Sequence, residues 1–226
     1  TVTVGGNLVA TTDDNSGVIN LGTLAVDGTV ALTTNGSGNA TLVNDAGLDF
    51  AASTVGGTLS ATATLGNMTD SGALTIAGTS SFTTSANNAT IALDTTTNAF
   101  TGAVSLNATG STGHVTVVGE SGLDLGVSTV GGNLVATATT GNISDSSNLT
   151  VTGTSTFVTG VSGSDIVLDS SGNAFSNAVI LRADDGNETF GNIIFVDSGE
   201  VRVHSSADAN GDLYINAATD AAVGGN

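Results

Sequence analysis

The sequence predicts an all-β fold: a right-handed parallel β-helix (β-solenoid) with coils of about 21–30 residues, grouped in 75-residue units of three coils. Three observations lead to this prediction. The chain repeats itself over long stretches, its apolar residues alternate with Thr and Ser, and its composition disfavours helices.

The internal repeat is long and free of gaps. Adding 75 to each residue number places Leu48–Leu106 on Leu123–Leu181. The phrase STVGG then falls on itself, and Asp70 falls on Asp145. Self-similarity at a fixed period indicates stacked structural repeats.

Each unit divides further into coils. Val55, Ile76, Phe100 and Val130 each begin a strand-like run, and their numbers rise in steps of 21, 24 and 30, which add up to 75. One step is one turn of a solenoid, so the unit is predicted to hold three coils.

The N-terminal unit is shorter. Its markers Val4, Val26 and Val55 follow each other in steps of 22 and 29, which add up to 51 rather than 75. The missing stretch is as long as the step from Ile76 to Phe100, that is, one coil. A solenoid tolerates such a deletion because each coil contacts only its neighbours.

The strand pattern is visible in LTVTGTSTFVT at residues 149–159, where apolar residues alternate with Thr or Ser. Gly, Asn, Asp and Ser separate such runs, as turns require. Proline, which cannot donate to a strand ladder, is absent. Right-handedness follows from the crossover rule. The residues predicted to point inward, together with their counterparts in the next repeat, are Leu59, Leu74, Ile76, Phe82, Ile91, Leu93, Phe100, Val104 and Leu106.

The whole chain is expected to be a single β-solenoid segment, with units at about 4–54, 55–129 and 130–226. After Leu181 the third copy diverges. The chain opens on TVTVGG and closes on VGGN, and neither end carries a polar cap. We therefore expect a segment excised from a longer repeat array, or a subunit whose ends meet those of its neighbours.

The charge is strongly acidic. The formal net charge is −18, and Arg182 and Arg202 are the two basic residues. Binding to nucleic acid needs Lys and Arg on phosphates, so a nucleic-acid partner is not expected. The same balance argues against docking on anionic lipid. No stretch approaches the ~18 apolar residues of a membrane span, so no membrane insertion is expected.

Two acidic turns in the third unit are candidate calcium sites. Asp208, Asn210 and Asp212 place oxygen ligands at alternating positions, as a calcium loop does, but no bidentate Glu follows. A similar turn holds Asp184, Asp185 and Glu188, and Asp13–Asn15 is a third. A solvated turn without metal explains the same residues, and we weigh it above calcium. Apart from this structural Ca²⁺, no cofactor is expected.

Catalysis is not expected. Parallel β-helices include polysaccharide lyases and hydrolases, which use a strong base or a pair of carboxylates. Lys is absent and the two arginines lie in the irregular third unit. His114 follows Gly in the slot held by Asn39, which indicates a turn residue rather than a metal ligand. His204 stands beside Arg202 with nothing to support a catalytic role.

Two long phrases carry a family resemblance: VGGTLSATATLGNMTDSGALTIAGTSSFTT at 55–84 and VGGNLVATATTGNISDSSNLTVTGTSTFVTG at 130–160. They resemble the repeats of giant bacterial surface proteins, the filamentous-haemagglutinin-like adhesins and related β-strand-repeat proteins. The resemblance implies a secreted, right-handed β-helical rod that projects from a cell or builds a filament. It supplies no catalytic residues. The export domain of two-partner-secreted members is not visible, which leaves the secretion route open.

The expected function is therefore a non-catalytic, extracellular stalk or filament module of a large bacterial surface adhesin. One alternative is a subunit that self-assembles end to end into an extracellular filament or surface layer. A third is a glycan- or receptor-binding module that uses the loops of Arg182–Asp212. The expected partners are the continuation of the same chain, a second copy joined end to end, or a cell-surface glycan or protein.

Overall fold

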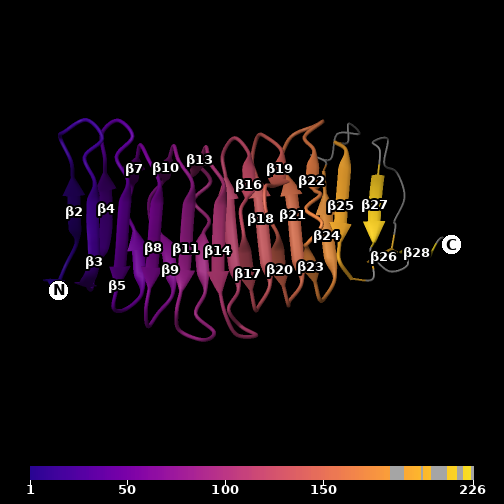
Figure 1. Cartoon of the computed structure of the whole chain (residues 1–226), viewed down its shortest axis with the longest axis horizontal. Helices are drawn as coiled ribbons and strands as arrows, with labels where there is room; N and C mark the ends of the chain where they lie inside the picture. The colour runs from indigo at the N-terminus through magenta and orange to yellow at the C-terminus, as the bar shows by residue number, and fades with distance from the viewer. Residues whose placement is uncertain (184–190, 200, 205–212, 218–220, 225–226) are drawn as a thin grey trace.

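The computed structural model is an elongated stack of β-strands, with the N-terminal strands at one end and the C-terminal strands at the other (Figure 1). It describes residues 1–183 and 191–199, and the backbone alone of 201–204, 213–217 and 221–224. In these ranges every regular element is a strand and every strand pair is parallel. The fold is a β-solenoid of about nine coils, which confirms the predicted all-β parallel architecture.

Two large sheets form the walls of the solenoid. The first, called sheet A here, contains β1 (Val2–Val4), β3 (Ile19–Val26), β5 (Ala40–Asn44), β8 (Leu59–Ala63), β11 (Ser80–Thr84), β14 (Val104–Ala108), β16 (Leu123–Leu125), β17 (Ser128–Val130), β19 (Ile143–Asp145), β20 (Leu149–Val151), β22 (Ile166–Leu168), β23 (Ala174–Phe175), β25 (Ile193–Asp197) and β27 (Leu213–Ala217).

The second, called sheet B, contains β2 (Leu8–Thr11), β4 (Thr29–Thr33), β6 (Leu48–Phe50), β7 (Ser53–Val55), β9 (Met68–Asp70), β10 (Leu74–Ile76), β12 (Ile91–Leu93), β13 (Ala99–Phe100), β15 (Val115–Gly119), β18 (Leu134–Ala138), β21 (Ser155–Thr159) and β24 (Val179–Arg182). Beyond β24, the strands β26 (Val201–His204) and β28 (Ala221–Gly224) pair with each other instead.

Within a coil the two walls differ. One wall is a single five-residue strand, as in β8 and β11, and the other is a pair of short strands separated by a bend, as in β9 with β10. In the coils of β5, β8 and β11 the single strand lies in sheet A and the pair in sheet B. In the coils of β18, β21 and β24 the single strand lies in sheet B and the pair in sheet A.

Two of the predicted coil steps are confirmed as single turns, because Val55 pairs with Ile76 and Ile76 pairs with Phe100. The third step, from Phe100 to Val130, was predicted to be one long coil, and this prediction is wrong. Phe100 lies in sheet B, whereas Val130 lies in sheet A and pairs with Ala108 of the preceding coil. The step from Phe100 to Val130 is therefore one and a half coils.

The three-coil unit is wrong for the same reason. From β5 the chain makes three full turns within sheet A, to β8, β11 and β14, and then crosses to β15 in sheet B. Ala40 at the start of β5 and Val115 at the start of β15 are equivalent positions in the sequence repeat. One repeat thus corresponds to three and a half coils.

The shorter N-terminal unit also ends on a half-coil. Leu8 of β2 and Leu59 of β8 occupy the same place in successive units, yet they lie in opposite sheets. The path from β2 through β4 and β7 to β8 is two and a half coils, one coil fewer than the longer units.

A continuous apolar core fills the solenoid. All nine residues predicted to point inward, from Leu59 to Leu106, are buried. Among their counterparts in the next repeat, Phe175, Val179 and Leu181 are only partly buried. These three lie in the coil of β24, whose described partner is β21 alone, so sheet B covers them from one side only. Phe82 packs edge-to-face on Phe50 and Phe100, with ring centroids 6.1 Å away in both pairs.

Candidate functional site

The turns between coils are held by side chains that cap the backbone of the next coil. Asn39 Oδ1 accepts the backbone N–H of Thr58 at 2.8 Å. His114 Nδ1 accepts the backbone N–H of Asn133 at 2.9 Å, across the same sequence spacing. The prediction that His114 is a turn residue equivalent to Asn39 is confirmed. In the ranges that the structure describes, no three His, Cys, Asp or Glu side chains gather as metal ligands.

The most elaborate polar site is a buried carboxylate at the end of β9. Asp70 is 8% exposed, and its carboxylate accepts hydrogen bonds from the next coil: Asp94 N at 3.0 Å, Thr95 N at 3.4 Å and Asn98 Nδ2 at 2.5 Å. Asn98 is fully buried, and its Oδ1 accepts the backbone N–H of Leu74 at 2.8 Å. We call this pair the first Asp–Asn clasp. It fixes the loop between β12 and β13.

The same arrangement recurs in the next repeat as the second Asp–Asn clasp. Asp145, 7% exposed, accepts from Asp169 N at 2.8 Å and from Asn173 Nδ2 at 2.6 Å. Asn173 Oδ1 in turn accepts the backbone N–H of Leu149 at 2.8 Å. Because β9 belongs to sheet B and β19 to sheet A, the two clasps lie on opposite walls of the solenoid.

Burial raises the pKa of Asp70 and of Asp145 above the ordinary value of 3.8, although their hydrogen-bond donors work in the opposite direction. The donors to Asp70 are neutral amide, hydroxyl and backbone groups. A buried carboxylate that receives several backbone and amide donors is satisfied as an acceptor, so each clasp has the chemistry of a structural fastening.

Among the described residues, four buried polar atoms have no hydrogen-bond partner, and they form two pairs related by the sequence repeat. Ser80 Oγ and Ser155 Oγ point inward between apolar neighbours, and Asp49 Oδ1 and Asp124 Oδ1 lie at equivalent places in β6 and β16. Each pair repeats with the sequence, so these atoms belong to the design of the repeat rather than to a single local site.

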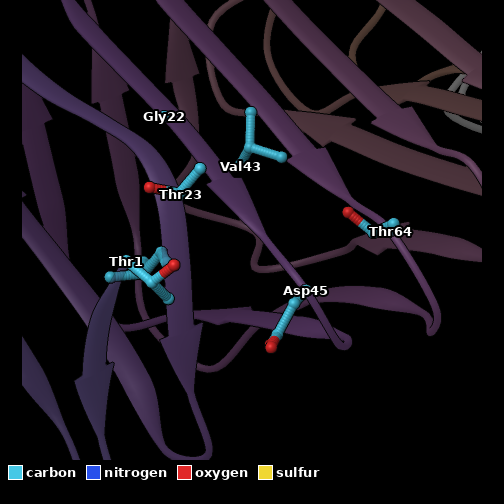
Figure 2. A pocket seen from close by; sticks show the side chains of 7 residues that line it. Thr1, Gly22, Thr23, Val43, Asp45 and Thr64 are labelled. Carbon is cyan, nitrogen blue, oxygen red and sulfur yellow. The ribbon is translucent and has the colours of Figure 1, made fainter.

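A hollow of about 250 Å³ lies near the N-terminal end (Figure 2). It sits beside a β-bulge in β3, where the pairing with β5 shifts its register between Leu21 and Leu24. Its lining residues are Thr1, Gly22, Thr23, Leu24, Val43, Asp45 and Thr64. Threonine hydroxyls and one carboxylate are the polar side-chain groups of this lining, a set without a base–nucleophile pair.

The six predicted calcium ligands, Asp184, Asp185, Glu188, Asp208, Asn210 and Asp212, lie outside the described residues. So do most of the loops assigned to glycan or receptor binding. The third acidic turn is described: Asp13, Asp14 and Asn15 are exposed, and Gly17 N donates to Asp14 O at 3.1 Å.

Sequence reasoning did not find the Asp–Asn clasps. A signal was present, since an Asp is followed at the same spacing by an Asn in both copies, at Asp70 with Asn98 and at Asp145 with Asn173. The alternation of strands marks Asp70 and Asp145 as inward residues, but it does not show which backbone groups of the next coil they meet.

The described part of the chain contains no helix that is long and apolar enough to cross a membrane. Among known families, the one described as repeats of unknown function (DUF5649) matches the chain at residues 37–107 and 112–182. Together these stretches cover more than half of the sequence. The chain belongs to this repeat family. No curated protein and no solved structure matches it.

Proposed function

We propose that this DUF5649 repeat protein is a non-catalytic structural module, a stiff stalk or filament segment of a large extracellular bacterial surface protein of the adhesin type. The observation that carries the proposal is the uninterrupted ladder of parallel strands in both walls, filled by one continuous apolar core. Bending such a rod requires breaking ladder hydrogen bonds and core contacts together.

The surface chemistry supports the same proposal. The walls turn Thr and Ser outward, as in the exposed ladder of Thr33, Thr54 and Thr75. A net charge of −18 keeps rods apart in solution. With two arginines and no lysine, the chain offers trypsin two cleavage positions, which suits exposure outside a cell.

Electron microscopy of the purified chain in negative stain, over a range of concentrations, tests the proposal. About nine coils at ~4.8 Å per coil give a rod roughly 40 Å long, so separate short rods are expected at every concentration. Compact globules, or rods that bend freely, would contradict it.

End-to-end self-assembly is the second candidate function, favoured by the exposed first coil. Val2 and Val9 are 47% and 71% exposed, and β1 and β2 each pair with a single strand. In the same images, uniform filaments that lengthen with protein concentration would support assembly of identical chains instead of a passive stalk.

A further inference from the structure

We propose that the repeat is built to show one outer surface on two opposite faces of the rod. The proposal starts from the odd number of half-coils in each unit. Segments related by the 75-residue repeat have the same sequence pattern but lie in opposite sheets: β8 in sheet A and β18 in sheet B, β10 in sheet B and β20 in sheet A.

The exchange happens where two five-residue strands follow each other directly. β14 is followed by β15 with no split pair between them, and β4 is followed by β5 in the same way. The turns joining them carry Gly36 and Gly110 in the left-handed region, at φ +59° and +87°. This single additional strand shifts all later strands by half a coil.

The half-coil is kept although the number of coils changes. The N-terminal unit has two and a half coils and the next has three and a half, so both exchange the walls. A unit that had lost the same length of chain at random positions would have no reason to preserve the half-coil. We infer that the exchange itself, rather than the length of the unit, is the constrained property.

The outward side chains show what the exchange displays. Thr54 and Thr75 form an exposed ladder on sheet B, and their counterparts Thr129 and Thr150 form the same exposed ladder on sheet A. A contact made through these residues on one face is offered again by the next repeat on the other face. A rod of such repeats therefore holds two copies of one partner on opposite sides, at an axial separation of about 17 Å (three and a half rises of ~4.8 Å).

The absence of cysteine from the chain allows a direct test. In the double variant Thr54→Cys/Thr129→Cys, each thiol is coupled to biotin, and bound monovalent streptavidin is counted by native mass spectrometry. We expect two streptavidins per chain, because the biotins face opposite sides. Saturation at one streptavidin would overturn the proposal.

Two deletions in this double variant supply matched controls. Removing residues 109–119 deletes the additional strand β15 and its turn, so Thr54 and Thr129 should share one face three coils apart, and streptavidin binding should fall to one. Removing residues 59–79 deletes one whole coil and should leave two bound, since the half-coil remains. Two streptavidins on the 109–119 deletion would contradict the proposal.

A second readout does not depend on the deletions folding. Spin labels on the same two cysteines of the full-length chain report their separation by pulsed electron resonance. We expect a distance that spans the solenoid and clearly exceeds the ~17 Å axial component. A separation equal to the axial component alone would place both labels on one face and reject the exchange. Neither readout depends on where the protein acts, so a failed stalk proposal and a failed exchange are distinguishable.

Discussion

The coils from β5 to β14 and those from β15 to β24 are two versions of one sequence on opposite walls. Leu59, Phe82 and Asp70 in the first version match Leu134, Phe157 and Asp145 in the second, and all six are buried in the same way. Their sheets are nevertheless reversed. Local sequence therefore specifies strand length, turn and inward face, but not the wall on which a strand lies. The number of half-coils before it decides that.

The largest expected effect comes from the aromatic residues of the two versions. Phe82 contacts two rings, Phe50 and Phe100, whereas the described ring partner of Phe157 is Phe175, because Leu125 stands where Phe50 would be. Both Phe82→Ala and Phe157→Ala should lower the free energy of unfolding by about 3–5 kcal/mol.

The lost ring pair sharpens the comparison. Phe82→Ala should cost up to ~1 kcal/mol more than Phe157→Ala, measured by urea unfolding followed by circular dichroism. Restoring the aromatic neighbour with Leu125→Phe is the control, and it should narrow the difference between the two sites. Equal costs in both backgrounds would show that the rings act only through their buried area.

Much of this fold was predictable from the sequence. The alternation in LTVTGTSTFVT sets the inward face, and the nine predicted inward residues are buried. The half-coil was not predicted, because the step between the markers Phe100 and Val130 is one that a single long coil would also produce. A step length does not tell one turn from one and a half turns. The pairing of Val130 with Ala108 does.

The site was harder to predict for a related reason. The repeat marks Asp70 and Asn98 as recurring residues, but the clasp joins groups from three segments: the end of β9, the start of β10 and the loop after β12. Which backbone N–H lies above a given carboxylate depends on the register between coils, and spacing within one coil does not contain that register.

The next largest effect concerns the clasps. Asn98→Ala should cost about 2–3 kcal/mol, because it leaves the buried N–H of Leu74 without an acceptor and removes a donor from Asp70. Asn173→Ala should cost the same through Leu149.

Amide hydrogen exchange checks this locally. Exchange at Leu74 should accelerate in Asn98→Ala and exchange at Leu149 should not, with the reverse in Asn173→Ala. A uniform acceleration throughout the chain in either variant would show that the clasps are not independent fastenings of the two versions.

The pH dependence of stability is expected to be smaller. Burial raises the pKa of Asp70 and Asp145 in the folded state, so the folded chain binds protons more tightly than the unfolded chain between the ordinary value of 3.8 and the raised one. Stability should therefore rise as the pH falls from neutral through the raised pKa values, and level off below 3.8.

The charge-matched comparison is Asp70→Asn against Asp94→Asn, since Asp94 is exposed. Asp70→Asn should flatten the dependence of the melting temperature on pH more than Asp94→Asn does. The same slope in both variants would mean that the net charge of −18, rather than the buried clasp, controls the acid response.

The smallest effect separates two kinds of buried serine that each version contains. Ser53 Oγ donates to Ala51 O at 2.8 Å and accepts from Leu32 N at 3.0 Å, and Ser128 repeats this arrangement. Removing the hydroxyl in Ser53→Ala leaves that N–H unpaired and should cost about 1 kcal/mol.

Ser80 and Ser155 are as deeply buried, but their hydroxyls have no partner among the described residues. A lone hydroxyl that is buried without a hydrogen bond destabilises the folded state, so Ser80→Ala and Ser155→Ala should be neutral or stabilising by up to ~1 kcal/mol. Thermal unfolding of the four single variants measures the contrast. A loss of stability in Ser80→Ala comparable to that of Ser53→Ala would show that the Ser80 hydroxyl is bonded, for example through a water molecule inside the solenoid. The matched result at Ser155 then decides whether such a bond belongs to the repeat or to one wall.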